Sequence, residues 1–253
     1  MSILSLESVT YTYRSKYQTL QALKGITCTF EQGRIYAVVG KRGSGKSTML
    51  SLMAGLDLPE TGTVVFRDQS TNTLDLDAYR RNDVAMIYQS FRLFPLLTAV
   101  ENVMFPMELH GISPKDAKKR AQELILRVDL PETVFTRFPS MLSGGEQQRV
   151  AIARALAMDT DLILADEPTG NLDSASSRNI INILRRLAHE QNYCVVVVTH
   201  DMSILDSMDV INQMQDGMVA RIKKNGKAGT ALRNCLTGIS HTFQWNEKRT
   251  SLP

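Results

Sequence analysis

The sequence has few cysteines and no long apolar run, and both scarcities narrow its possible functions. Three cysteines occur in 253 residues, Cys28, Cys194 and Cys235, and no two form a Cys-x-x-Cys pair. A disulfide framework or a zinc site is therefore not expected, and the thiols are predicted to be reduced and cytosolic. No apolar stretch approaches the roughly 18 residues that a membrane-spanning helix needs. If the protein serves a membrane process, another chain must supply the membrane part.

The sequence also has little net charge and no recognisable targeting signal. The formal net charge is only +3, and no long basic stripe with interleaved aromatic residues is present, so no nucleic-acid partner is expected. Residues 1–7 alternate apolar and polar side chains as an edge strand does, and they lack the basic start and apolar stretch of a secretion signal. With 43% hydrophobic residues, the chain has enough apolar side chains for one large domain or two lobes.

A glycine-rich loop is the first informative motif that is present. Residues 40–47 read GKRGSGKS and fit G-x-x-x-x-G-K-[ST], a loop whose backbone N–H groups surround nucleotide phosphates. Its glycines let the backbone approach the phosphates, and the helix that follows favours anions at its N-terminus. Lys46 would neutralise the β- and γ-phosphates, and the Ser47 hydroxyl would bind Mg²⁺. The predicted nucleotide-binding residues here are Gly40, Lys41, Arg42, Gly43, Ser44, Gly45, Lys46, Ser47 and Thr48.

Four apolar strands are predicted to end in polar residues at a common edge. The strands are residues 34–39, 84–88, 162–165 and 194–198. They lead, in that order, into Gly40, into Gln89, into Asp166 and Glu167, and into Thr199 and His200. Because ligands bind beyond the carboxyl ends of parallel strands in open α/β sheets, we expect these ends to form one site. Asp166 is placed to hold a metal, and Glu167 to orient or deprotonate an attacking water.

The remaining segments predict the architecture. We expect an α/β fold, a P-loop NTPase core with a mostly parallel sheet, an N-terminal antiparallel β subdomain and an inserted α-helical subdomain. Antiparallel strands are predicted at residues 3–13, 25–30 and 64–66. Helices are predicted at residues 47–54, 115–128, 146–157 and 174–190. Residues 91–157 contain no convincing strand and are assigned to the helical lobe, within a domain of residues 1–220 that precedes a tail of unknown structure, 221–253.

A second glycine motif points to a family. Residues 142–149 read LSGGEQQR, and residues 162–168 read LILADEP. Together with the loop at residues 40–47, these segments resemble the signature and Walker motifs of the ATP-binding cassette (ABC) ATPases. The resemblance covers roughly residues 1–220, the predicted ABC ATPase domain.

Two further segments narrow the resemblance. Residues 94–103 and 166–173 are similar to those of the small ABC ATPases for macrolide efflux, lipoprotein release and antimicrobial-peptide resistance. Arg42 departs from the family, which usually has a small or polar residue there. It is either a solvated loop charge or an added positive charge near the nucleotide or a partner subunit.

The resemblance implies roles that spacing alone would not reveal. ATP and Mg²⁺ are the implied cofactors. The implied catalytic residues are Glu167, His200 at the γ-phosphate, and Gln89 at the metal and water; the implied metal ligands are Ser47, Gln89 and Asp166. Tyr13 matches the aromatic residue that stacks on adenine, and Tyr11, which would face the same side of a strand, is the alternative.

Residues 143–145 imply a second subunit. Ser143, Gly144 and Gly145 begin a predicted helix, which is either an ordinary helix start or a second anion site. In the family this segment of one subunit closes over the phosphate loop of the other, which implies a head-to-tail homodimer with two ATP molecules at the interface. Asp173 lies in a segment that resembles the family's D-loop, which crosses that interface.

The implied function is ATP hydrolysis that energises a separate integral membrane permease from the cytoplasmic face of the membrane. The group suggests export or extraction of a peptide, lipoprotein or drug. The alternative is a non-transport cassette that couples ATP hydrolysis to a cell-division or cell-wall complex. A DNA-repair or translation cassette fits less well, because those proteins split or duplicate the cassette and this chain has one uninterrupted set of motifs.

Residues 91–97 are too apolar for a solvated connection, and we favour a groove for a permease helix over lobe core.

Overall fold

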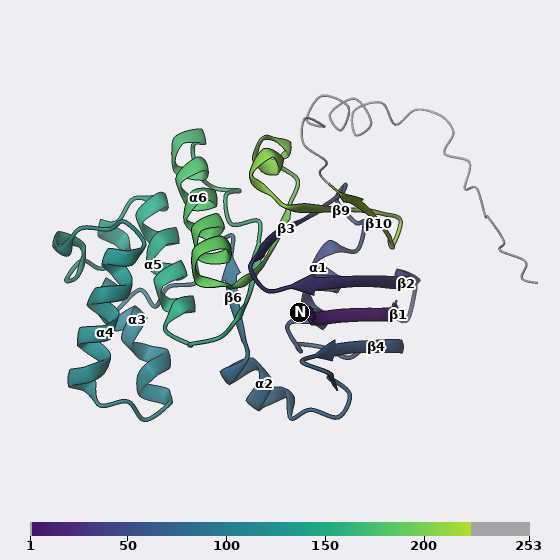
Figure 1. Ribbon diagram of the computed structural model, residues 1–253, viewed down its shortest axis with the longest axis horizontal. Coiled ribbons are helices and arrows are strands. Elements are labelled where there is room, and N and C mark those ends of the chain that lie inside the picture. Colours follow the sequence, from purple (N-terminus) through teal and green to yellow (C-terminus); the bar gives the residue numbers. More distant parts are fainter. Residues whose placement is uncertain (1, 224–253) are drawn as a thin grey trace, which may run out of the picture. The chain divides into compact units, whose positions relative to one another are not determined.

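Two sheets and a set of helices make up the computed structural model, which describes residues 2–223 (Figure 1). The strands are β1 (Ser2–Arg14), β2 (Thr19–Glu31), β3 (Arg34–Val39), β4 (Thr61–Phe66), β5 (Gln69–Ser70), β6 (Val84–Tyr88), β7 (Leu162–Asp166), β8 (Cys194–Thr199), β9 (Val210–Gln215) and β10 (Met218–Lys223). The α-helices are α1 (Lys46–Met53), α2 (Leu76–Asn82), α3 (Ala99–Leu109), α4 (Pro114–Arg127), α5 (Gly144–Leu156) and α6 (Ser174–Gln191). Short 3₁₀ helices are η1 (Glu132–Val134), η2 (Pro139–Met141) and η3 (Met202–Ser207).

The larger sheet has six strands in the order β10-β9-β3-β8-β7-β6. Strands β9, β3, β8, β7 and β6 are parallel, and β10 adds an antiparallel edge. Every residue of β8 is buried, which explains its uninterrupted valine run, because both faces of this sheet are covered. In register, Tyr88 lies opposite Asp166, Asp166 opposite Val198, and Val39 opposite Thr199. The predicted common edge of four strand ends is therefore confirmed.

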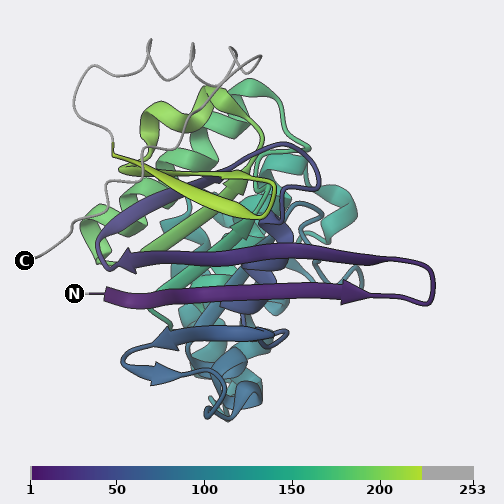
Figure 2. The same cartoon turned by 90° about the vertical axis from the view of Figure 1, so that its right-hand side faces the viewer.

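The smaller sheet is antiparallel, in the order β2-β1-β4-β5. Leu4 of β1 pairs with Phe30 on one side and with Phe66 on the other, so the prediction of an edge strand at residues 1–7 is wrong. Alternation of polar and apolar residues reports one buried face and says nothing about how many neighbours a strand has. The long β1–β2 hairpin is clearest in Figure 2. Its buried face packs with α1 and the larger sheet around Phe30 and Tyr36, whose rings meet edge to face.

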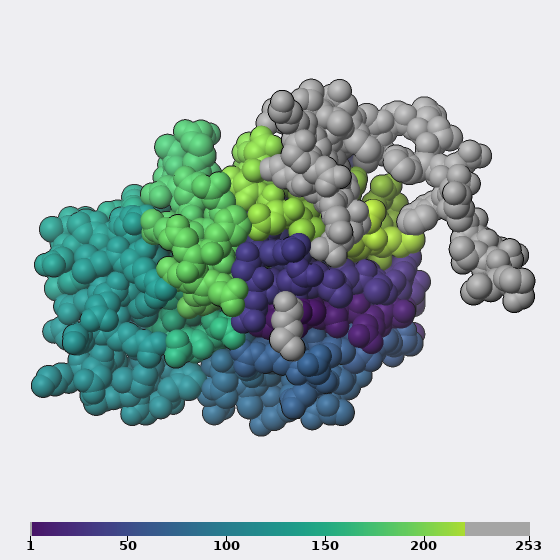
Figure 3. All heavy atoms as spheres, viewed as in Figure 1, coloured from purple at the N-terminus to yellow at the C-terminus, as the bar shows by residue number. Residues whose placement is uncertain are grey.

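Helices α3, α4 and α5 form the predicted helical lobe, and no strand lies between residues 91 and 157. Figure 3 shows this lobe in teal at one end of the described residues and the N-terminal strands in purple and blue away from it. The helix starts follow local chemistry. Thr98 and Ser143 each begin a helix with a capping box, and Ser113 caps α4, which has Pro114 in its first turn. Asn192 ends α6 at φ 62°, a left-handed position that asparagine tolerates.

The helices α2 and α3 and the strands β5, β9 and β10 were not predicted individually, although α3 lies within the predicted helical lobe. The β9–β10 hairpin carries a local signal, because Asp216 and Gly217 both have positive φ (49° and 80°) between the paired residues Gln215 and Met218. The predicted domain end at residue 220 falls inside β10, and the compact unit extends to Lys223. The predicted tail therefore falls mostly on residues 224–253, which lie outside the described residues. Within residues 2–223, no helix combines the length and apolar character needed to cross a bilayer.

Candidate functional site

The phosphate loop connects the end of β3 to the start of α1 through two left-handed glycines. Gly43 and Gly45 have φ values of 77° and 100°, which side chains other than glycine rarely adopt. A Cβ atom on Gly45 would lie 2.5 Å from the Ala22 carbonyl oxygen, and one on Gly40 would overlap the Met214 carbonyl oxygen. The loop is thus packed tightly against β2 and β9 and accepts only glycine at these two positions.

The donors of this loop suit a phosphate chain. Lys46 is buried, and its Nζ donates to the carbonyl oxygens of Gly40 (2.8 Å) and Lys41 (2.9 Å). Burial lowers the pKa of Lys46, and the nearby carboxylates Glu167 and Asp166 oppose that shift. No side chain caps α1 at Gly45, and the buried hydroxyl of Ser44 has no hydrogen-bond partner. An uncapped helix start, an ammonium group and an unpaired hydroxyl together fit an anion.

Two adjacent carboxylates follow β7. Asp166 ends the strand, and burial, followed by the charge of Glu167, raises its pKa, while Lys46 and Arg92 lower it. Glu167 turns out of the strand direction at φ 45° and donates its backbone N–H to the Val198 carbonyl oxygen at 2.9 Å. Among residues 2–223, no group of three or more His, Cys, Asp and Glu side chains is arranged to hold a metal. The donor set fits a Mg²⁺ ion held by one or two carboxylates and completed by phosphate and water.

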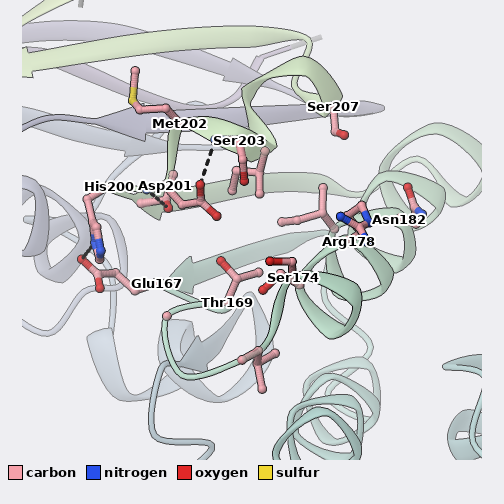
Figure 4. Close-up of a pocket in the computed structure, with 16 residues that line it drawn as sticks. Glu167, Thr169, Ser174, Arg178, Asn182, His200, Asp201, Met202, Ser203 and Ser207 are labelled. Carbon is pink, nitrogen blue, oxygen red and sulfur yellow. Dashed lines mark hydrogen bonds and ion pairs between the residues drawn. The ribbon is translucent and has the colours of Figure 1, made fainter. Parts of the chain in front are cut away.

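His200 contacts Glu167 directly. Its Nδ1 lies 2.9 Å from the Glu167 Oε1 atom, and Figure 4 shows the two side chains facing one another across the ends of β8 and β7. The imidazole is exposed, whereas Glu167 is half-buried. This contact fixes one carboxylate oxygen and leaves the other for a substrate or water.

Gln89 lies at the same edge but is engaged by the loop after β7. Its Nε2 donates to Asn171 Oδ1, and Asn171 Nδ2 donates to the Gln89 carbonyl oxygen, both at 3.3 Å. A Cβ atom on Gly170 would lie 2.6 Å from Gln89 Nε2, so the absent side chain makes room for the amide. The structure therefore joins Gln89 to residues 170–173, a link that the sequence did not indicate.

Tyr13 lies beside the first turn of α1. Its hydroxyl is 3.2 Å from Thr48 Oγ1, and 49% of its surface is exposed. Tyr11 shares the same side of β1, because the two rings meet edge to face at 5.0 Å. Tyr11 donates its hydroxyl to Asp57, and this hydrogen bond raises its pKa to about 12. Tyr11 is therefore held by Asp57, and Tyr13 is the freer of the two rings to contact a ligand near the phosphate loop.

The second glycine motif is a capped helix start. Ser143 Oγ accepts from the Glu146 N–H, and Glu146 Oε2 accepts from the Ser143 N–H at 2.8 Å. The hydrogen bond from the Ser143 N–H, followed by one that the Ser143 hydroxyl donates to the same carboxylate at 2.8 Å, lowers the pKa of Glu146. Asp173 similarly caps α6 by accepting from the N–H groups of Ala175 and Ser176 at 2.9 Å. Among the described residues, no hydrogen bond links residues 143–145 to the phosphate loop.

A hollow of about 680 Å³ lies beside the Glu167–His200 pair (Figure 4). Polar side chains of α6 and η3 line it, including Ser177, Arg178 and Ser203, and no residue of the phosphate loop does. The sequence carried no signal for this hollow, because its walls come from segments that are separate in the chain. The phosphate loop itself lies at the surface, where Lys41, Arg42 and Ser47 are exposed.

Comparison with known proteins agrees with this geometry. The family described as ABC transporter matches residues 23–170, more than half of the chain. The chain belongs to this family. The ABC transporter ATP-binding protein YclH of Bacillus subtilis is 38% identical over 89% of this chain and 98% of the relative. The macrolide export ATP-binding/permease protein MacB of Bartonella quintana is 38% identical over 91% of this chain but only 36% of that longer protein.

A solved structure extends the likeness to three dimensions. The ATP-binding cassette MJ0796 of Methanocaldococcus jannaschii, in a dimeric post-hydrolysis state bound to ADP and Pi, has a TM-score of 0.81 and 40% identity. The match covers 88% of this chain and 99% of that one. The predicted ABC fold is confirmed, as is the predicted ATPase subunit of an ABC transport system.

Proposed function

We propose that this cassette binds ATP and Mg²⁺ at the phosphate loop, pairs head to tail with a second copy, and drives a separate membrane permease from the cytoplasmic face of the membrane. One observation carries the proposal: Lys46, Asp166 and the Glu167–His200 pair meet at one sheet edge. This arrangement combines a phosphate-binding cation, a metal-binding carboxylate and a base for water.

Each residue at this edge has a distinct proposed task. Lys46 and the N–H groups at the start of α1 bind the phosphates, and Tyr13 stacks on adenine. Ser47, Asp166 and Gln89 would hold Mg²⁺, which would neutralise charge on the phosphates. Glu167 orients the attacking water and accepts its proton, with His200 fixing one carboxylate oxygen at 2.9 Å and reaching the γ-phosphate. The raised pKa of Asp166 is consistent with a site that a divalent cation completes.

A second copy is proposed to complete the site. The phosphate loop is exposed, and the start of α5 presents Ser143 and two glycines at the surface of a separate lobe. The related cassette MJ0796 is dimeric in its solved structures. We infer that residues 143–145 of one copy close over the ATP of the other, with Asp173 near the same interface.

The permease contact is proposed for the loop at residues 91–97. None of these seven residues is buried, and Leu96 is 85% exposed, which favours a surface over lobe core. The Phe94 ring contacts that of Phe105 of α3 at a tilt of 53°, with ring centroids 4.6 Å apart. The buried Asn102 side chain fixes this loop by bonding the N–H of Phe94 (2.8 Å) and the carbonyl oxygens of Phe94, Leu97 and Thr98. A preformed, exposed apolar patch is typical of an interaction site.

Similarity to the macrolide export protein supports export as the direction of transport. The proposed cargo is a peptide, lipoprotein or drug. The test is co-purification of a membrane permease from cells that express this chain. It compares Leu96→Glu with a matched control, Tyr17→Glu, in which the replaced residue is 89% exposed in the turn between β1 and β2. We expect only Leu96→Glu to lose the permease, with both variants folded and active as ATPases in isolation. Retention of the permease by Leu96→Glu would contradict the proposed surface.

A further inference from the structure

The turn after Gln89 adopts an unfavourable backbone conformation. Phe91 and Arg92 are consecutive and both left-handed, at φ 58° and 48°. Residues with a Cβ atom avoid this region, and it persists only where surrounding contacts impose it. The contacts that impose it here identify a residue whose role the sequence did not reveal.

Arg154 of α5 supplies those contacts. Its Nη1 donates to the Arg92 carbonyl oxygen at 2.6 Å, and its Nη2 donates to the Phe91 carbonyl oxygen at 3.0 Å. The planar guanidinium thus bonds both left-handed residues at once, a geometry that lysine cannot reproduce. Burial lowers the pKa of Arg154, and no ion pair in residues 2–223 includes it. The Phe94 ring lies 5.9 Å from the guanidinium, but the hydrogen bonds of this half-buried cation go only to carbonyl groups, an unusual arrangement for packing alone.

The Phe91–Arg92 turn contacts both the sheet edge that carries Gln89 and Asp166 and the start of α5. Gln89 precedes it and exchanges hydrogen bonds with Asn171. The Phe91 ring lies 3.7 Å from where a Gly144 Cβ would be, next to the start of α5. The Arg92 guanidinium stacks 3.8 Å above the Tyr88 ring, and its charge opposes the rise in the pKa of Asp166 that burial and Glu167 cause. A change in this turn would therefore move Gln89 relative to Asp166.

We propose that Arg154 is a positioning residue for ATP hydrolysis, which holds the Phe91–Arg92 turn so that Gln89 points at the metal and water beside Asp166. This inference rests on the proposed role of Gln89. In this proposal Arg154 acts only through the backbone of the turn. It also links α5, whose N-terminus carries Ser143, to the hydrolytic edge through one side chain.

The first test is a double-mutant cycle between Arg154→Lys and Gln89→Ala, with Arg186→Lys as the matched control. Arg186 also donates to a backbone carbonyl, that of Arg127 at 2.9 Å, but on α6. We expect Arg154→Lys to lower kcat about tenfold and to raise the Mg²⁺ concentration for half-maximal activity, with ATP binding by the lone subunit within about twofold of wild type. In the Gln89→Ala background the same change should cost less than about twofold, because its target is already missing.

The outcomes separate the two proposals. Wild-type turnover in Gln89→Ala would overturn the role of Gln89 itself. Slow turnover in Gln89→Ala, with the full further loss from Arg154→Lys, would overturn only the positioning role of Arg154.

A second pair of variants tests the backbone directly and leaves Arg154 in place. Arg92→Gly and Arg92→Val both remove the stacked guanidinium, but glycine accepts φ near +48° and valine resists it. We expect Arg92→Val to be about tenfold slower than Arg92→Gly, with the same rise in the Mg²⁺ requirement. Arg92→Gly should also restore much of the turnover lost in Arg154→Lys. Equal rates for the two Arg92 variants, with both folded by thermal unfolding, would contradict the proposal.

Discussion

The phosphate loop (residues 40–47) and the signature loop (residues 143–145) are both glycine-rich helix starts, yet they are built in opposite ways. Before α1, Gly43 and Gly45 are left-handed, no side chain caps the helix, and the Lys46 ammonium group bonds the loop carbonyls. At α5 neither glycine has positive φ, and Ser143 and Glu146 cap the helix reciprocally. The first loop leaves the buried Ser44 hydroxyl unpaired and the start of α1 without a side-chain cap, so both can bind a ligand. The second is stable on its own and can serve as a cover that a ligand held elsewhere recruits.

The largest effect on ATP hydrolysis is expected for Glu167→Gln. This variant also tests whether the signature loop acts as a cover over a nucleotide held by the phosphate loop. The amide cannot accept a proton from water, so hydrolysis should fall by about 10²–10⁴-fold while ATP binding persists. If the signature loop is a cover, ATP should then hold a stable dimer in which both loops contact one nucleotide. Single-turnover ATPase assays and light scattering with and without ATP check this. Turnover near the wild-type rate would remove Glu167 from the role of base.

The two loops should separate cleanly in variants of each. Lys46→Ala removes the cation that is proposed to bind the phosphates, and we expect a loss in ATP affinity of the lone subunit of tenfold to a hundredfold, about 1.5–3 kcal/mol. Ser143→Arg should leave that affinity unchanged and prevent ATP-dependent dimerisation. Fluorescent-nucleotide titration and light scattering measure the two properties. Loss of ATP binding by monomeric Ser143→Arg would mean that one chain's loops share a nucleotide.

Mixing the two inactive variants sharpens the comparison further. A head-to-tail pair of Lys46→Ala with Ser143→Arg contains one site with both lesions and one with neither. Partial ATPase activity should therefore return on mixing if one intact site is sufficient. Neither variant mixed with itself can form an intact site, so each alone is the control.

Much of the candidate site could be predicted from the sequence, because each strand end and each glycine-rich loop is a local segment of the chain. The apolar runs at β3, β7 and β8 required burial on both faces, and the polar residues that end them could only meet at one edge. Ser143 followed by Glu146 is a capping signal that needs no tertiary information. The Asp216–Gly217 hairpin was equally local and was overlooked.

What could not be predicted depends on contacts between distant segments. Arg154 lies more than sixty residues from the turn whose carbonyl oxygens it binds, and neither segment carries a sequence signal that predicts this contact. The interior position of β1 follows from pairing with both β2 and β4, which alternation cannot reveal. The Gln89–Asn171 pair depends on the neighbouring order of β6 and β7 in the same way.

Glycine substitutions should distinguish the loops by stability. Gly45→Ala meets both a left-handed φ and the Ala22 carbonyl oxygen at 2.5 Å, so we expect a loss of about 2 kcal/mol or more in the free energy of unfolding. Gly144→Ala occupies a helical position 3.2 Å from a methyl group of Leu172, where better helix propensity offsets mild crowding. Its effect should stay within about 1 kcal/mol. Urea denaturation of both variants measures the difference, and equal losses would contradict it.

The smallest effect concerns pH, and only the signature loop should show it. The Ser143 N–H hydrogen bond holds the pKa of Glu146 below its ordinary value, so the folded state prefers the carboxylate. Stability from this bond is fully present above the unfolded pKa, near 4.3, and is lost as pH falls through the lower folded pKa. Glu146→Gln should therefore cost about 0.5–1 kcal/mol at pH 7, and the difference from wild type should shrink at lower pH. The first turn of α1 has no acidic residue and supplies no such contribution. Urea titrations of both proteins between pH 7 and pH 3 measure the difference, and a cost for Glu146→Gln that stays constant as the carboxylate protonates would contradict the capping role.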